Sequence, residues 1–381
     1  MRELWWRVAC GVALALLVAG GIGNTAFADG EIDVEAHPLI WNPDNRQETK
    51  TGDLEWAGGV ELTSPDGDFG GWSGLSVSAD GSRLLAISDK GRWLSGRLLY
   101  DERGRIYGVA DAHIAPMLGL DGKPVTRTKQ LGDAEGLTVD GDDPLASQAY
   151  VSFERAHRIW KYDIANHALA AKPLQLLTQR RLGRLAFNGG IEALAWHPAR
   201  PGKDDAGLVA ITEDTLNPRG NIRAFLAEGR DFQRFEVKPH APYKPTDLTR
   251  LPNGDYLLLE RRFSVLGGVG MEIRYLKSAA LTPGALVDGP VLIDVGQSYS
   301  IDNMEGLSAR SDGKGGAWLY MISDDNFNPI QRTLLLMFHL PADTMKRLHG
   351  APKSAEATEI PLRGSQSAGA PSPSPDGQIP D

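Results

Sequence analysis

Hydrophobic and polar residues alternate in short runs along most of the chain, and this pattern predicts β-strands. Each run is rich in aliphatic or aromatic residues and is bounded by Gly, Asp, Asn or Pro, as strands between turns are. Such runs lie at 83–88, 149–153, 208–212, 255–259, 317–323 and 333–340. Helical periodicity is scarce, with room for a turn or two at 165–179 and 341–348. The pattern therefore predicts an all-β protein.

A short phrase recurs along the chain at nearly regular intervals. It reads Glu135-Gly136-Leu137, Glu192-Ala193-Leu194 and Glu305-Gly306-Leu307, with weaker copies at Ser73-Gly74-Leu75 and Thr246-Asp247-Leu248. The five leucines are spaced by 62, 57, 54 and 59 residues. A period of about 40 to 60 residues with several strands per unit is typical of the blades of a propeller.

The repeat length also predicts the number of blades. Dividing the mature ordered length, roughly 335 residues, by the mean repeat gives nearly six units. Only five copies of the phrase are visible, so we expect the sixth blade to form from both termini, with 56–63 pairing beside the segment after Thr333. The predicted fold is an all-β, six-bladed β-propeller over residues 38–362. A large β-sandwich or two β domains is the alternative, and the fixed period disfavours it.

The N-terminus has the features of a signal peptide at residues 1–28. Arg2 and Arg7 precede an apolar stretch at 8–22, and Ala26-Phe27-Ala28 has the small-x-small pattern of a cleavage site. Cleavage after Ala28 predicts a periplasmic or secreted protein with no stable membrane span. The alternative is an uncleaved membrane anchor, for which the apolar stretch is shorter than the ~20 residues that a spanning helix needs.

Composition narrows the partners and the chemistry further. The net charge is −9 without a basic block, which argues against a nucleic-acid partner. The one cysteine, Cys10, lies in the predicted signal peptide, so the mature chain has no disulfide and no thiol chemistry. Residues 364–381 are rich in Ser, Pro, Gly and Ala and are predicted to form a disordered tail.

The propeller hypothesis brings many acidic residues to one place. The first strand of each blade lines the channel and the second runs antiparallel to it, so the start of the first and the end of the second meet at one mouth. The acids at these positions are Glu135, Glu192, Asp247 and Glu305 on first strands, and Asp89, Glu154, Glu213, Glu260 and Asp324 after second strands. We therefore expect nine carboxylates to converge and to repel one another unless cations compensate them.

Hard cations and basic side chains are the two sources of compensation. Calcium takes six to eight oxygen ligands, and its predicted ligands are Asp89, Glu154, Glu213, Asp247, Glu260 and Asp324. The predicted catalytic acids are Glu135, Glu192 and Glu305. Arginine forks match phosphate or carboxylate oxygens, and the basic residues that follow the acids, namely Lys90, Arg155, Arg261 and Arg262, are predicted to bind substrate.

Each of these residues also has a structural interpretation. A Glu at the start of a blade can accept hydrogen bonds from backbone N–H groups of the next blade and so hold the ring together. The acids that end the second strands can be solvated strand ends, and the arginines can form salt bridges to the same carboxylates. The sequence leaves these alternatives open.

Other catalytic patterns are missing from the sequence. The segment Gly71-Trp72-Ser73-Gly74-Leu75 breaks the G-x-S-x-G pattern at its last position, and neither H-E-x-x-H nor a Walker A loop occurs. The run at 324–328 resembles the start of a calcium loop, but Pro329 and Leu335 stand where an EF-hand needs Gly and Glu. An EF-hand is therefore excluded.

The phrase and its surroundings resemble the bacterial phytase-like domain family, also called "esterase-like activity of phytase". The matching segments are Asp133-Ala134-Glu135-Gly136-Leu137, Gly190-Ile191-Glu192-Ala193-Leu194, Leu258-Leu259-Glu260-Arg261-Arg262-Phe263-Ser264 and Asn303-Met304-Glu305-Gly306-Leu307. The likeness runs from about residue 70 to 340. It implies a propeller related to calcium-dependent phytases and an esterase or phosphoesterase activity on a small-molecule substrate.

Three functions fit this sequence. The first is a metal-assisted hydrolase of a carboxylic or phosphate ester with its site at the channel mouth. The second is a non-catalytic propeller that binds a ligand or a protein at the same mouth. The third is a lactonase-like enzyme, whose single calcium ion needs fewer acids than this mouth offers.

Overall fold

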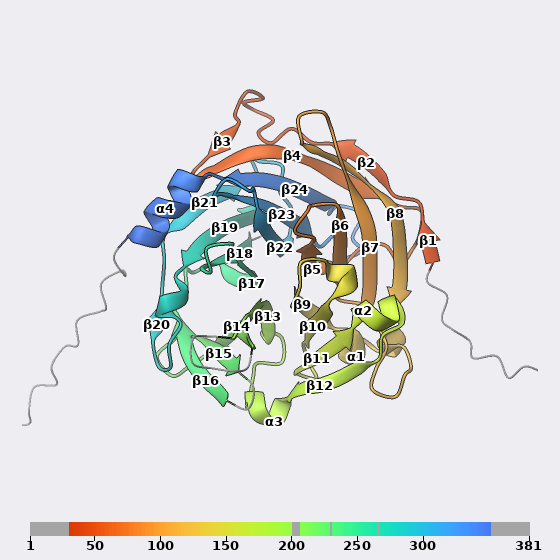
Figure 1. Ribbon diagram of the computed structural model, residues 1–381, viewed down its shortest axis with the longest axis vertical. Coiled ribbons are helices and arrows are strands. Elements are labelled where there is room, and N and C mark those ends of the chain that lie inside the picture. Colours follow the sequence, from red (N-terminus) through yellow and green to blue (C-terminus); the bar gives the residue numbers. More distant parts are fainter. Residues whose placement is uncertain (1–29, 200–205, 229–230, 265–266, 352–381) are drawn as a thin grey trace, which may run out of the picture.

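Five β-sheets are arranged around a central axis in the computed structural model, which describes residues 30–199, 206–228, 231–264 and 267–351 (Figure 1). Each sheet is one blade. Its first strands are hydrogen-bonded in chain order from the axis outward, and in two blades strands from the N-terminal segment are added at the outer edge. The protein is therefore an all-β propeller, as predicted. Within the described ranges, no helix is long and apolar enough to cross a membrane.

The first three blades contain these strands, given from the inside outward. Blade 1 is β5 (Trp72–Val77), β6 (Arg83–Ser88), β7 (Arg92–Tyr100), β8 (Ile106–Pro116) and β1 (Gly30–Ile32). Blade 2 is β9 (Ala134–Val139), β10 (Gln148–Phe153), β11 (Arg158–Asp163) and β12 (Pro173–Thr178). Blade 3 is β13 (Ile191–His197), β14 (Gly207–Leu216), β15 (Ile222–Glu228), β16 (Asp231–Val237) and β20 (Leu286–Val287).

The last two blades complete the ring. Blade 4 is β17 (Lys244–Arg250), β18 (Tyr256–Ser264), β19 (Gly268–Leu276) and β21 (Val291–Gly296). Blade 5 is β22 (Met304–Ser311), β23 (Ala317–Ser323), β24 (Thr333–Leu340), β4 (Leu54–Thr63) and β2 (Glu35–Pro38), with β3 (Lys50–Thr51) beside β4. The helices are α1 (Lys129–Gly132), α2 (Ile164–His167), α3 (Gln179–Leu182) and α4 (Ala342–Gly350), with 3-10 turns at Val125–Arg127, Pro144–Ala146, Ala168–Ala170 and Ser278–Ala280.

The prediction of six blades is wrong. The five copies of the phrase lie in the five inner strands β5, β9, β13, β17 and β22, one for each blade. The predicted pairing of the two chain ends is confirmed, because β4 lies antiparallel to β24 with Val60 opposite Leu335. That pairing completes blade 5 and forms no sixth sheet. The length estimate failed because the N-terminal segment supplies outer strands to blades 1 and 5.

The inner strands approach one another closely, and the glycine of the phrase allows this. A Cβ on Gly136 would lie 2.2 Å from the carbonyl oxygen of Glu192 in the next blade. A Cβ on Gly306 would lie 3.0 Å from the backbone nitrogen of Leu75. The repeated Gly therefore marks the positions where one inner strand meets the next.

Each pair of neighbouring blades encloses its own hydrophobic cluster. In β18, Leu257 and Leu259 pack toward blade 5, whereas Tyr256 and Leu258 pack toward blade 3. Because both faces of a blade are buried, its central strands are continuous apolar runs. Successive side chains still point to opposite faces, and this alternation determines which acids reach the channel.

The predicted signal peptide at 1–28, with Cys10, and the predicted tail at 364–381 lie outside the described residues.

Candidate functional site

A cavity of about 960 Å³ opens at the mouth where the inner strands begin. The first two strands of each blade are antiparallel, so the start of one and the end of the other lie at this mouth. We call it the acidic cavity. Its wall contains nine carboxylates, Asp89, Asp133, Glu135, Glu154, Glu192, Glu213, Asp302, Glu305 and Asp324, and three cations, Lys129, Arg155 and Arg261.

The structure brings seven of the nine acids named from the sequence to this cavity. They are Asp89, Glu135, Glu154, Glu192, Glu213, Glu305 and Asp324. They come from blades 1, 2, 3 and 5, and blade 4 contributes Arg261 in place of an acid. The two remaining acids, Asp247 and Glu260, lie elsewhere.

Asp247 holds neighbouring blades together. Its side chain is fully buried, with Oδ2 accepting a hydrogen bond from the backbone N–H of Leu307 at 2.6 Å and Oδ1 accepting one from Leu248 at 2.8 Å. The prediction that Asp247 is a metal ligand at the mouth is therefore not supported by its position. The structural interpretation, which the sequence left open for acids at blade starts, describes this residue.

Replacing Asp247 with alanine should lower the free energy of unfolding by about 1–3 kcal/mol. The change leaves the buried N–H of Leu307 without its acceptor, and an unsatisfied buried donor costs about 1–3 kcal/mol. Urea unfolding followed by tryptophan fluorescence measures the loss, with the exposed Asp44→Ala as the matched control. A variant as stable as that control would show that Asp247 does not hold the blades together.

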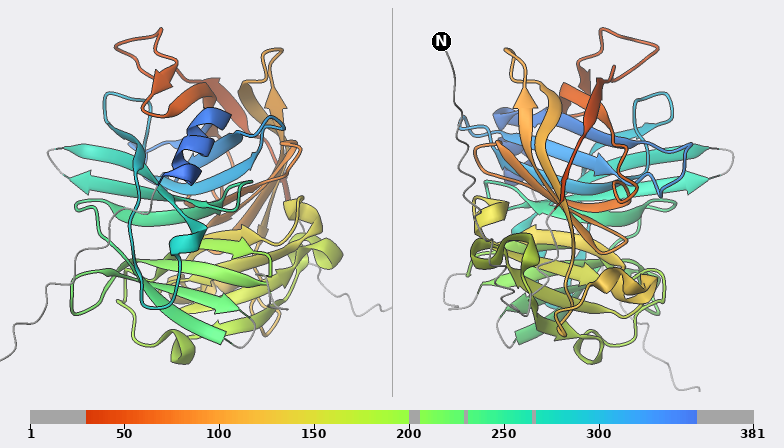
Figure 2. Two further views of the ribbon diagram at one scale, coloured as in Figure 1. Left: turned by 60° about the vertical axis from the view of Figure 1, so that its left-hand side comes forward. Right: turned by 90° about the vertical axis from the view of Figure 1, so that its right-hand side faces the viewer.

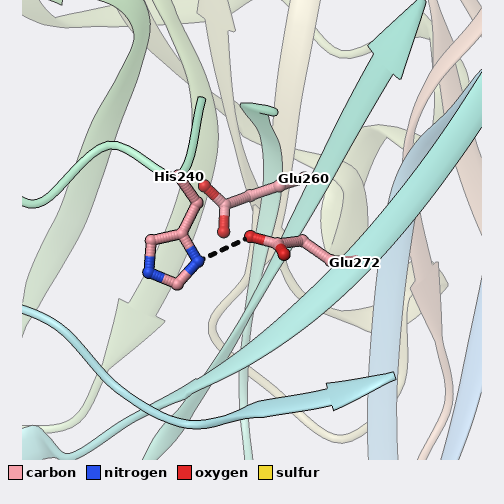
Figure 3. Close-up of side chains that lie close together, drawn as sticks. All are labelled: His240, Glu260 and Glu272. Carbon is pink, nitrogen blue, oxygen red and sulfur yellow. Dashed lines mark hydrogen bonds and ion pairs between the residues drawn. The ribbon is translucent and has the colours of Figure 1, made fainter. Parts of the chain in front are cut away.

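Glu260 lies on the opposite face of β18 from Arg261, since adjacent strand residues point to opposite sides. Both of its oxygens accept hydrogen bonds from the Arg274 guanidinium, and both side chains are fully buried. Figure 3 shows Glu260 and Glu272 directed toward the ring of His240, whose Nδ1 lies 2.9 Å from Glu272 Oε1. Potential ligand atoms of these three residues lie within 4.8 Å of one another. Glu260 is buried against Arg274 and does not line the acidic cavity, so the prediction that it lies at the channel mouth is wrong.

The basic residues of the acidic cavity are paired with its acids. Arg261 Nε lies 2.6 Å from Glu305 Oε1, although its N–H is not aligned with that oxygen, and Arg261 Nη2 lies 3.6 Å from Glu213. Arg155 forms an ion pair with Asp133. The salt-bridge alternative therefore describes both arginines as the structure places them.

The other two predicted substrate-binding residues do not line the cavity. Lys90 places its Nζ 2.9 Å from the centre of the Phe327 ring, a cation–π contact. Arg262 Nε donates to the hydroxyl of Tyr243 at 3.1 Å. Neither position supports a direct role in binding a ligand of the acidic cavity.

The sequence interpretation missed several polar residues of the wall. Asp133 is 1% exposed and lies 2.6 Å from Lys129 Nζ, which also contacts Asp89. Asn303 donates to Glu305 Oε1 at 2.8 Å. Asp133 and Asn303 both stand two residues before the Glu of the phrase, so this repeated position is the signal that could have found them. Lys129 has no such signal, because it comes from α1 between the blades.

Burial and mutual repulsion raise the pKa values of the carboxyl groups in the cavity. Burial raises the pKa of Glu305 to about 8 and that of Asp324 to about 7. Burial, followed by the neighbouring carboxylates, raises the pKa of Glu192 and of Glu135 well above its usual range. The cavity therefore holds more carboxyl groups than its three cations can neutralise, and the raised pKa values favour the protonated forms of several of them.

The donor set of the cavity fits a hard cation. Oxygens of Asp133, Glu135 and Glu154 lie within 4.8 Å of one another, and so do oxygens of Glu154, Glu192 and Glu213. Glu192 is 8% exposed, and its Oε2 is buried without a hydrogen-bond partner, as is Oδ1 of Asp89. Unpartnered carboxylate oxygens facing a polar cavity are the ligands that calcium prefers.

The raised pKa values predict how stability varies with pH in the absence of metal. A carboxyl whose pKa is raised on folding stabilises the fold below its ordinary pKa of about 4 and loses that effect as pH rises through the folded value. With values of about 8 for Glu305 and about 7 for Asp324, chelator-treated protein should melt at a lower temperature at pH 8 than at pH 5. Thermal unfolding between pH 5 and 8 measures this, and a rising profile would contradict it.

Comparison with known proteins identifies a family. The sequence model described as Phytase-like, esterase-like activity of phytase, matches residues 67–327. A search of curated proteins gives no match. Among solved structures, the chain is similar to the crystal structure of a protein of unknown function from Dyadobacter fermentans DSM 18053. The two sequences are 11% identical and the TM-score is 0.41, and the match covers 81% of this chain and 91% of that chain. The structure of U3-55K is 12% identical, with a TM-score of 0.34 over 71% of this chain and 96% of that one.

Proposed function

This chain belongs to the phytase-like family, and from that premise we propose that it is an exported, metal-assisted hydrolase of ester or phosphoester bonds acting in the acidic cavity. The observation that carries the proposal is the carboxylate of Glu192. It is buried in the cavity wall among other acids, and one of its oxygens has no hydrogen-bond partner. The proposed export rests on the signal-peptide pattern of residues 1–28.

The proposed metal is calcium, which oxygens of either of two overlapping groups would hold: Asp133, Glu135 and Glu154, or Glu154, Glu192 and Glu213. When bound, calcium supplies positive charge that polarises a carbonyl or phosphoryl oxygen and acidifies water. Asp89 and Asp324 line the same wall and add negative charge around the ion. In this proposal, Glu154 would be a ligand in either case, because this residue belongs to both groups of acids.

The surroundings of Glu192 and Glu305 suggest different catalytic roles for the two carboxyl groups. Glu192 Oε2 has no hydrogen-bond partner, and burial raises the pKa of this carboxyl. A bound cation would favour its ionised form, in which it could take a proton from water. Glu305 has a pKa raised to about 8, so it holds a proton near neutral pH that it can give to the leaving oxygen. Arg261 contacts Glu305 and faces the cavity, where it orients that carboxyl. The negative charge of Glu135 contributes to raising the pKa of Glu192.

A non-catalytic propeller that binds a ligand at the same mouth is the second candidate. One observation favours it, namely that Lys129, Arg155 and Arg261 already have carboxylate partners within the cavity. A phosphate ester would have to displace those partners or rely on the metal for its positive charge. The two candidates differ in turnover, which is directly measurable.

The test is an assay of the purified chain beginning at Asp29 on p-nitrophenyl acetate, p-nitrophenyl phosphate and phytate, with millimolar calcium or with chelator. The proposal predicts turnover of at least one substrate that chelator abolishes and calcium restores. If no substrate is hydrolysed above background in calcium, the binding propeller is the better account. Turnover that persists fully in chelator would remove the metal from the proposal.

A further inference from the structure

Three large apolar side chains are exposed around the acidic cavity. Phe263 is 67% exposed and Ile330 is 87% exposed, and both line the cavity. Phe187 is 62% exposed, next to the lining residue Asn188, and its ring lies 5.6 Å from the guanidinium of the lining residue Arg155. We call these three residues the apolar rim. They come from three separate parts of the chain, so no local sequence feature explains why they gather at one mouth.

The apolar rim surrounds a strongly acidic interior. Phe263 lies on β18 opposite Val269 on β19, another residue of the cavity wall. Figure 2 shows this β18–β19 hairpin, in teal, extending beyond the body of the ring. Ile330 lies between β23 and β24, in the segment that also carries the lining residues Asn326 and Asn328. A ligand whose polar group enters the cavity therefore passes exposed apolar side chains.

The charge of the interior limits what that ligand can be. Nine carboxylates line the cavity against three cations, and each of those cations contacts a carboxylate. A ligand with several negative charges needs cations that these already paired side chains do not supply, whereas a neutral ester needs none. Single exposed apolar residues are ordinary on protein surfaces. Three beside one cavity offer a binding surface for an acyl chain or an aromatic ring.

From these observations we infer that the substrates are neutral carboxylic esters with an apolar acyl or aryl group, and not polyanionic phosphate esters. The inference rests on the proposed hydrolase function and specifies its substrate class. The ester group lies among the acids of the cavity, and the apolar group packs against Phe187, Phe263 and Ile330. Burial of each added methylene strengthens binding by up to about fourfold where it is complete.

The test compares kcat/KM for p-nitrophenyl acetate, butyrate and octanoate in calcium, each below its aggregation concentration, with phytate alongside. The inference predicts a value for octanoate at least tenfold above that for acetate. In the triple variant Phe187→Ser, Phe263→Ser and Ile330→Ser the ratio of the octanoate value to the acetate value should fall below threefold. The three side chains are exposed, so their removal should leave the fold intact. Leu174→Ser on β12, at a residue 72% exposed on the outer strand of blade 2, is the matched control and should retain the preference.

The outcomes separate this inference from the proposed function. Acetate hydrolysis with no dependence on chain length overturns the inference and leaves the hydrolase standing. If the triple variant keeps the preference for octanoate over acetate, or if phytate is hydrolysed faster than any ester, the inference is wrong but the proposed hydrolase function stands. If no ester and no phosphoester is hydrolysed in calcium, the proposed function fails and the inference fails with it.

Discussion

Replacing Glu192 with glutamine should lower calcium-dependent turnover at least a hundredfold. Glutamine keeps the size of the side chain but cannot take a proton or carry the charge that a metal ion requires. A positioned acid–base group is typically worth 10² to 10⁴ in rate. The measurement is kcat on whichever substrate of the panel the wild-type protein hydrolyses, at saturating calcium.

Two controls accompany this variant. Glu102→Gln alters an exposed carboxyl in the turn between β7 and β8 and should leave turnover unchanged. The melting temperature of Glu192→Gln in chelator should equal or exceed that of wild type, because the change removes a buried carboxyl whose pKa is raised by burial. Turnover within threefold of wild type in a folded Glu192→Gln protein would place the chemistry elsewhere.

Replacing Arg274 with methionine should lower the free energy of unfolding by about 3–5 kcal/mol, the cost of breaking a buried ion pair. Arg274 and Glu260 are both 0% exposed, so the change leaves a carboxylate buried without its partner. Arg274 Nη1 also donates to the backbone oxygen of Lys238 at 2.9 Å, a contact that is lost as well. Urea unfolding followed by tryptophan fluorescence measures the change.

A double variant separates the lost pair from lost packing. Glu260→Leu with Arg274→Met removes both charges and should be more stable than Arg274→Met alone by at least about 1 kcal/mol, since apolar replacements of buried pairs are often tolerated. If the double variant is as unstable as the single one, packing and not the unpaired carboxylate causes the loss. A loss below about 1 kcal/mol in the single variant would contradict the structural role given to this pair.

The sequence predicted the propeller from one repeated phrase because that phrase has a physical cause. Its glycine stands where inner strands meet, as at Gly136, and its leucine packs between blades, as at Leu137. The number of blades could not be obtained by dividing the length, because blades differ in their outer strands. Blade 2 has four strands, whereas β4, β2 and β3 widen blade 5 from the N-terminal side.

The sequence could predict which acids lie at the channel mouth only where the direction of the strands determines it. Antiparallel pairing brings Glu135 and Glu154 to one mouth wherever blade 2 sits in the ring. The two faces of a blade cannot be told apart from the sequence when both are buried, as in the apolar run from Tyr256 to Leu259. The sequence could therefore not show that Arg261 faces the cavity while Glu260 pairs with Arg274. Contacts between distant parts of the chain, such as that of Lys129 with Asp89, need the three-dimensional structure.

We propose that the acidic cavity binds calcium through Glu154 and its neighbours. The most direct measurement is a calorimetric titration of calcium into chelator-treated protein at pH 7.5, for wild type and for Glu154→Gln. We expect saturable binding to wild type and an affinity at least tenfold weaker in the variant, because Glu154 belongs to both groups of acids. Absence of saturable binding to folded wild type, or equal affinity in the two proteins, would contradict it.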